Sequence, residues 1–169
     1  YIYNDLYAST NNIYSLWMTK EAVANDDVLL LDSDILFDPQ IITTLLKSSH
    51  PNSLALNVHE LGEEEIKIIA DKENRILEIS KTCSIKDAIG ESIGIEKMSS
   101  AFMSKLFAEM DIMITERGQS NVFYELAFEN IIQQGVEMYA VDTTSMFSME
   151  LDTVEDFENA CSKIPSHLL

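Results

Sequence analysis

Basic residues are scarce in this chain of 169 residues. Lys and Arg total 11 against 29 Asp and Glu, which gives a formal net charge of −18. Proteins that bind nucleic acid neutralise its phosphates with Lys and Arg, so this balance argues against a nucleic-acid partner. It would also repel a nucleotide unless a metal ion or a local basic group intervened. We interpret most of the acidic residues as a solvated surface.

Other scarcities narrow the class of protein further. The two cysteines, Cys83 and Cys161, lack metal-ligand spacing and predict free thiols in a cytoplasmic protein. No apolar run is long enough to span a bilayer, so we expect no membrane partner. The N-terminus has no signal-peptide pattern and starts at Tyr1 rather than at Met, which suggests a start partway into a longer protein. Without repeats or Pro/Gly-rich linkers, residues 1–169 are predicted to form a single domain, and the oligomeric state stays open.

Strands and helices are predicted to alternate along the chain. Helical spacing or capping signals predict helices over 11–24, 38–47, 99–110, 121–134 and 153–163. Apolar runs predict strands over 26–31, 53–59, 66–70, 76–79, 91–95, 136–141 and 147–151, and the polar turn 71–75 makes 66–79 a hairpin. This order favours an α/β fold with a mainly parallel mixed sheet covered by helices on both faces.

Two acidic segments lie at the ends of predicted strands. Asp32 and Asp34 follow the apolar run 28–31, and Asp152 follows the strand 147–151. Ligands of open α/β sheets bind at the carboxyl ends of strands, and Mg²⁺ usually takes one or two carboxylates plus substrate phosphates. The pair therefore predicts one magnesium site that serves nucleotide chemistry. The alternative for 32–34 is a solvated turn, although Asp38 already serves as the cap of the next helix.

Three segments in order resemble one family. Residues 28–37, with the sequence Val-Leu-Leu-Leu-Asp-Ser-Asp-Ile-Leu-Phe, resemble the metal-binding strand of GT-A-type nucleotidyltransferases. The Glu-Leu-Asp-Thr-Val-Glu-Asp run at 150–156 is similar to the closing signature of that family. The Asn-Asn-Ile-Tyr-Ser-Leu segment at 11–16 is similar to the choline-phosphate cytidylyltransferase branch, which lies close to the sugar-phosphate nucleotidyltransferases.

The resemblance implies a reaction and roles for residues. A phosphorylated small acceptor would attack the α-phosphorus of a nucleoside triphosphate, CTP by branch resemblance, and pyrophosphate would leave. By position, Asp34 and Asp152 would be the magnesium ligands, with Asp32 a further possible ligand or a supporting partner. Lys81 would face the phosphates as a compact charge. The alternative for Lys81 is an exposed surface lysine.

Further residues would hold the substrates. By resemblance, Glu91 would bond the hydroxyl or amine of the acceptor, with Gly94 allowing close approach. Tyr124, Glu125 and Phe128 would help to hold a quaternary ammonium. The alternatives are a solvent-facing acid for Glu91 and core packing for at least one of the aromatic residues.

The nucleotide end is predicted to involve the start of the first helix. Asn12 and Ser15, with Tyr14, are candidates for contacts near the nucleotide, although Asn11 or Asn12 could instead cap the helix. Met98 stands near a position where the choline branch has an aromatic residue. That departure leaves phosphocholine-like compounds, aminoalkylphosphonates and sugar phosphates open as acceptors.

One family signature is not found in these residues. The family begins with a strand and a Gly-rich loop of the type Ala-Ala-Gly-x-Gly-x-Arg, whose backbone N–H groups cradle the triphosphate. None of the five glycines here lies in such a loop. We therefore predict the C-terminal portion of a nucleotidyltransferase with little turnover on its own. The alternatives are an Asp-x-Asp glycosyltransferase of similar fold and a degenerate, non-catalytic domain.

Overall fold

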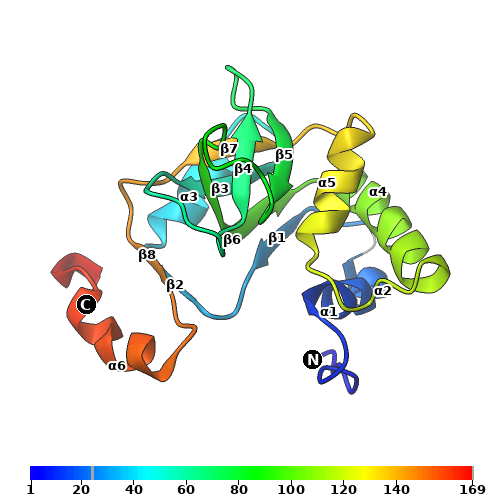
Figure 1. Cartoon of the computed structure of the whole chain (residues 1–169), viewed down its shortest axis with the longest axis horizontal. Coiled ribbons are helices and arrows are strands. Elements are labelled where there is room, and N and C mark those ends of the chain that lie inside the picture. The colour runs from blue at the N-terminus through cyan, green and yellow to red at the C-terminus, as the bar shows by residue number, and fades with distance from the viewer. Residues whose placement is uncertain (24, 169) are drawn as a thin grey trace.

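The computed structural model describes residues 1–23 and 25–168, and a mixed sheet lies at its centre (Figure 1). Five strands follow the order β5-β4-β6-β3-β7, a sixth strand, β1, pairs with β6, and β2 and β8 form a separate pair. The strands are β1 Val28–Leu31, β2 Ile35–Phe37, β3 Ser53–Asn57, β4 Lys67–Ala70, β5 Ile76–Ser80, β6 Gly90–Met98, β7 Tyr139–Asp142 and β8 Ser148–Glu150.

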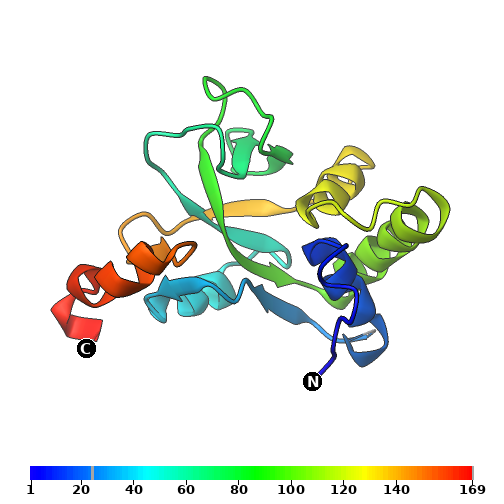
Figure 2. The same ribbon diagram turned by 60° about the horizontal axis from the view of Figure 1, so that its bottom comes forward.

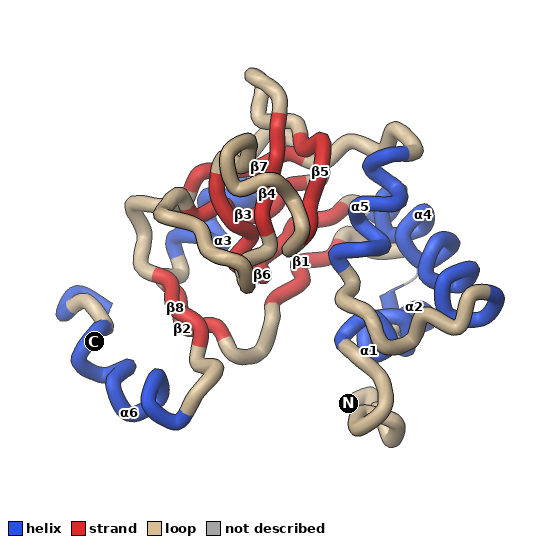
Figure 3. Tube along the Cα trace, viewed as in Figure 1, coloured by secondary structure: helices blue, strands red, loops and turns tan. Residues whose placement is uncertain are grey.

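Helices lie on both sides of this sheet, as the tube in Figure 3 shows. They are α1 Asn12–Met18, α2 Lys20–Val23, α3 Gln40–Lys47, α4 Ser100–Asp111, α5 Glu125–Gln133 and α6 Val154–Lys163. A π-helical turn, Ile112–Glu116, extends α4, and a short 3₁₀ helix, Ser166–Leu168, follows α6. No helix in the described residues is long and apolar enough to cross a membrane.

The mixed α/β class is confirmed, but the prediction of a mainly parallel sheet is wrong. Among the described strands, only β3 and β7 pair in parallel, whereas β6 runs antiparallel to β1, β3 and β4. Parallel neighbours need crossover connections. No helix separates β3, β4, β5 and β6 in the chain, so these strands are joined by turns and loops and fold antiparallel.

β6 is the longest strand, and it runs through the middle of the molecule (Figure 2). β3 pairs along one of its edges. On its other edge β4 pairs at Gly90 and Glu91, and β1 pairs from Ile95 to Met98. The partner of β6 therefore changes around Gly94, which has a positive φ of 70°.

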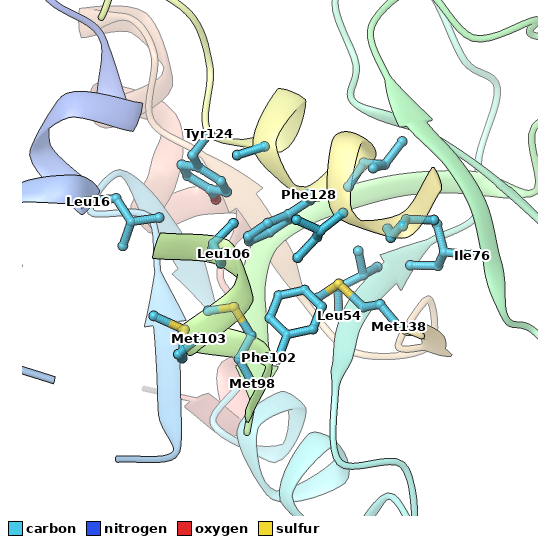
Figure 4. Close-up of a cluster of buried hydrophobic side chains, with 14 of the residues drawn as sticks. Leu16, Leu54, Ile76, Met98, Phe102, Met103, Leu106, Tyr124, Phe128 and Met138 are labelled. Carbon is cyan, nitrogen blue, oxygen red and sulfur yellow. The ribbon is translucent and has the colours of Figure 1, made fainter. Parts of the chain in front are cut away.

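Two apolar clusters cover the two faces of the sheet. On one face, Ile41 and Leu45 of α3 pack against Ala55, Ile93 and Ile95. The larger cluster joins α1, α4 and α5 to the other face (Figure 4). Alternation along β3 explains the division, because Leu54 and Leu56 face the large cluster while Ala55 faces α3.

Most predicted elements are present with shifted ends. The 66–79 hairpin is confirmed as β4 and β5, and the capping box of Thr153 and Asp156 is confirmed at the start of α6. The helix predicted over 11–24 divides into α1 and α2, and residue 24 lies outside the described part. α3 begins at Gln40 rather than Pro39, although the Asp38 carboxylate still accepts the Gln40 N–H at 2.8 Å. Both cysteines are free thiols, as predicted.

Candidate active site

The two acidic segments meet through a strand pair that sequence reasoning missed. β2 and β8 run antiparallel, with Ile35 opposite Glu150. Beyond this pair, the Leu151 N–H donates to the Asp34 carbonyl at 2.9 Å. Asp34 and Asp152 therefore both lie just beyond the end of this strand pair. Both carboxylates are exposed, and both line one cavity.

This cavity has a volume of about 780 Å³ and a strongly acidic lining. Its lining includes eight carboxylate side chains, from Asp32, Asp34, Glu64, Glu65, Glu91, Glu125, Glu150 and Asp152. Of the described residues, Lys81 is the one lysine or arginine in the lining. An anionic substrate therefore needs an added cation here.

The pKa of Glu150 reflects the concentration of negative charge in this cavity. Its burial, together with the charges of Asp152, Glu91 and Asp34, raises its pKa from 4.5 to about 7. A bound cation would relieve this repulsion. The carboxylate oxygens of Asp34 and Asp152 are of the ligand type that Mg²⁺ prefers. Within residues 1–23 and 25–168, no group of three or more His, Cys, Asp or Glu side chains could hold a metal ion.

Asp32 differs from Asp34 in its surroundings. The Tyr124 hydroxyl, which is buried, lies 3.2 Å from both Asp32 carboxylate oxygens and donates to them. Burial raises the Asp32 pKa, although the Tyr124 hydrogen bond opposes this. A Cβ at Gly94 would lie 2.9 Å from the Asp32 Cγ, so this glycine leaves room for the carboxylate. The close approach that Gly94 allows in this structure is that of Asp32, and the predicted approach of an acceptor stays a prediction.

Two further carboxyl groups lie deep beside Asp32. Glu96 is fully buried, and this burial raises its pKa well above the usual range. Glu125 is 6% exposed, and burial raises its pKa to about 7. Among the described residues, the Oε2 atoms of both have no hydrogen-bond partner. Glu125 also lines the cavity, but its unpaired Oε2 is itself buried and is not open to a ligand there.

Lys81 lies on the cavity wall, where the sequence predicted a phosphate contact. Its ammonium is 3.3 Å from the Glu64 Oε2 and 4.8 Å from the centroid of the Phe123 ring. The side chain is 34% exposed, so it is neither a free surface lysine nor a buried one. The exposed Glu64 can swing away and leave Lys81 to a ligand.

Glu91 is held by a histidine that received no role from the sequence. The His59 Nε2 lies 2.7 Å from the Glu91 Oε1, and the His59 Nδ1 lies 2.8 Å from the Glu60 carbonyl. Burial lowers the His59 pKa, but the hydrogen bond and charge of Glu91 outweigh it and raise the pKa. Both residues line the cavity. The Glu91 side chain is 18% exposed, so the alternative of a solvent-facing acid is not observed.

Tyr124 and Phe128 do not form an aromatic cage in the cavity. Phe128 is 0% exposed, lies in the large apolar cluster and packs edge-on against Phe102 (Figure 4). Tyr124 is 2% exposed, and neither ring belongs to the cavity lining. The predicted contact of Phe128 with an acceptor is therefore replaced by core packing. Tyr124 instead contacts residues of the lining, through its hydroxyl on Asp32 and its main-chain N–H on Asn12.

The first helix contributes one of its two candidates. Asn12 lines the cavity, and its side-chain oxygen accepts the Tyr124 N–H at 2.9 Å, while Asn11 caps the helix. Ser15 is exposed on α1, accepts a hydrogen bond from Asn4 and does not line the cavity. The prediction of a nucleotide contact therefore keeps geometric support at Asn12 and loses it at Ser15.

Three residues of the site were missed. Glu150 lay within a recognised motif but carried no role of its own, and its position opposite Ile35 was hidden because β2 was not predicted. His59 and Glu96 had no sequence signal, since their roles arise from neighbours 32 and 28 residues away in the chain.

No family model matches the chain. A solved CTP:phosphocholine cytidylyltransferase from Streptococcus pneumoniae has a TM-score of 0.72, with 18% identity, over 94% of this chain and 66% of that one. The chain has the nucleotidyltransferase fold.

Other nucleotidyltransferase structures agree. The inositol-1-phosphate CTP transferase from T. maritima has a TM-score of 0.71 and 15% identity, and covers 98% of this chain and 62% of that one. A UDP-glucose pyrophosphorylase has a TM-score of 0.69 and 12% identity, with coverage of 90% and 59%. The chain thus spans 66% or less of the length of these three structures. At such identities the likeness extends to the fold alone.

Proposed function

We propose that this protein carries out magnesium-dependent nucleotidyl transfer. The donor is a nucleoside triphosphate, with CTP as the specific proposal, and the acceptor is a small phosphorylated molecule. Pyrophosphate is the leaving group. The observation that supports this proposal is the β2–β8 ladder, because it brings Asp34 and Asp152 to the rim of one acidic cavity.

Acidic residues of the chain would bind the metal ion, and a lysine would bind a substrate phosphate. Asp34 and Asp152 would hold the metal ion, which supplies charge neutralisation at the substrate phosphates when bound. Lys81 would leave Glu64 and place its ammonium on a phosphate oxygen. Asn12 would contact the nucleotide from the start of α1. Such positioning and neutralisation account for most of the catalysis in phosphoryl-type displacements.

The acceptor would bind near Glu91 and Glu125. Glu91 and Glu125 both line the cavity, and their carboxyl groups favour an acceptor that donates a hydrogen bond from an N–H or O–H group. A quaternary ammonium cannot donate such a bond, and Tyr124 and Phe128 offer it no exposed ring face. Aminoalkylphosphonates and sugar phosphates, which carry N–H or O–H donors, are therefore the acceptors that we propose ahead of phosphocholine. A cytoplasmic location would suit such substrates and the free thiols.

The test combines binding and product analysis. The 169-residue chain is titrated calorimetrically with CTP in the presence of Mg²⁺. It is then incubated with phosphocholine, phosphoethanolamine, 2-aminoethylphosphonate and glucose 1-phosphate, and pyrophosphate is measured. Because the chain spans two thirds or less of its structural neighbours, binding is the primary readout. Asp34→Asn should weaken binding by about 100-fold, whereas the surface variant Glu116→Asn should not affect it.

Two outcomes would contradict the proposal. Release of a nucleoside diphosphate from a nucleotide sugar would indicate a glycosyltransferase. Failure of the folded chain to bind either Mg²⁺ or nucleotide would indicate a non-catalytic domain.

A further inference from the structure

A lysine on β4 is buried although it has no carboxylate partner within hydrogen-bonding distance in the described residues. Lys67 is 1% exposed. Its ammonium donates to the Glu63 and Glu65 carbonyls at 3.2 Å each, and to the Lys81 carbonyl at 2.6 Å. A lysine ammonium has three donors, so all of them are used on backbone carbonyls.

The three carbonyls belong to two separate segments of the cavity wall. Glu63 and Glu65 lie in the loop before β4, and Lys81 follows β5. From the first segment, Glu64, Glu65 and Ile66 line the cavity, and from the second segment Lys81 does. The side chains repeat the link, because the Lys81 ammonium lies 3.3 Å from Glu64. Lys67 thus links both segments through its three hydrogen bonds.

The choice of lysine at this position needs a reason beyond packing. Burying an ammonium costs free energy unless its hydrogen bonds are satisfied, and an apolar residue would be less costly in a core. The next residue on β4, Ile68, is apolar and fully buried. What lysine adds is a fixed distance among three carbonyls that no strand pairing joins.

We propose that Lys67 is a positioning residue that fixes Lys81 at the cavity wall. The link to catalysis rests on the proposed function, in which Lys81 contacts a substrate phosphate. The clamp itself, which is the Lys67 ammonium with its three carbonyl partners, does not depend on the proposed function. Lys67 holds the main chain at residue 81, from which the Lys81 side chain reaches the cavity wall, and the exposed Glu64 can release the Lys81 ammonium to a ligand.

The clamp is tested by the chemical reactivity of Lys81. Lys67→Met retains the length of the side chain and removes the three donors. Competitive amine labelling followed by mass spectrometry measures the rate at Lys81 relative to Lys105, an exposed lysine on α4. Local opening should raise this ratio by about threefold or more. The control Lys72→Met, at an exposed turn position, should leave it unchanged.

Two further measurements keep the test decisive. In the wild type, one lysine ammonium should give a solvent-protected ¹⁵N–¹H signal that disappears in Lys67→Arg, so the clamp can be judged even if Lys67→Met does not fold. Lys67→Arg, which keeps a cation, should show a labelling ratio between those of the wild type and Lys67→Met. An unchanged ratio in folded Lys67→Met, or no protected ammonium in the wild type, would overturn the clamp.

The link to substrate is tested separately. If Lys67 acts through Lys81, Lys67→Met and Lys81→Met should each weaken CTP–Mg²⁺ binding by about tenfold, and the double variant should be no weaker than either. Additive losses would overturn the positioning role. If the wild type shows the clamp but binds no nucleotide, the proposed function fails while the clamp stands.

Discussion

Glu125 should make the protein less stable as the pH rises. Its carboxyl is 6% exposed, and its pKa is raised from 4.5 to about 7, mainly by burial. Below pH 4.5 the group is protonated in both the folded and the unfolded chain. Between pH 4.5 and 7 the unfolded chain ionises first, so the free energy of unfolding falls. Above pH 7 both states are ionised, and the loss is complete.

The size of this loss follows from the pKa difference. One pKa unit corresponds to about 1.4 kcal/mol. The rise from 4.5 to about 7 therefore predicts a loss of about 3 kcal/mol in the free energy of unfolding between acid and neutral pH. Glu125→Gln cannot ionise and should lack this part of the pH dependence. Any cost of its unpaired amide is the same at every pH.

The assay is urea unfolding followed by Trp17 fluorescence from pH 4.5 to 8. The difference between Glu125→Gln and the wild type should move in favour of the variant by about 3 kcal/mol across this range. Glu116→Gln, an exposed site, serves as the control and should follow the wild type at every pH. A Glu125→Gln curve parallel to that of the wild type would refute the reasoning, because it would mean that the carboxyl titrates alike in both states.

Three other substitutions have clear expected outcomes. Gly94→Ala should lower the free energy of unfolding in urea by about 2–4 kcal/mol, because the new Cβ has a left-handed φ and overlaps the Asp32 carboxylate. Gly118→Ala, which has a similar φ but open space, should lower it by only about 1–2 kcal/mol. Equal losses in the two variants would contradict the overlap. Thr153→Ala should cost about 1 kcal/mol and increase hydrogen exchange at the start of α6, since it removes the capping box; unchanged exchange there would count against it. Asp34→Asn should reduce nucleotidyl transfer or CTP–Mg²⁺ binding by about 100-fold without a loss of thermal stability, as the side chain is exposed, and retention of binding would remove Asp34 from the site.

Local signals in the sequence predicted most of the elements. Thr153 with Asp156, Ser99 before α4 and the turn between β4 and β5 act over a few residues, so they can be recognised without the fold. Outside the β4–β5 hairpin the direction of strand pairing was predicted wrongly, because it depends on which strands meet. β2 was missed because its three residues carry no periodic pattern, yet this strand assembles the site.

Residues of the cavity lining were predicted where they lie in a sequence motif, and were missed where only contacts with distant parts of the chain place them there. Asp34, Asp152, Lys81 and Glu91 all reach the cavity. Phe128 did not, because helical spacing alone cannot tell a core face from a ligand face. The buried Lys67 had no signal, since its partners are carbonyls whose positions only the fold fixes.

Asp34 and Asp152 are proposed to be two halves of one cation site. Electron paramagnetic resonance can measure Mn²⁺ binding, in place of Mg²⁺, in the presence of CTP for the wild type, Asp34→Asn, Asp152→Asn and the double variant. Each single substitution should weaken Mn²⁺ binding by about tenfold or more, and the double variant should lose less than the product of the two. Unchanged Mn²⁺ affinity in either single variant, or losses that simply multiply, would contradict a shared site.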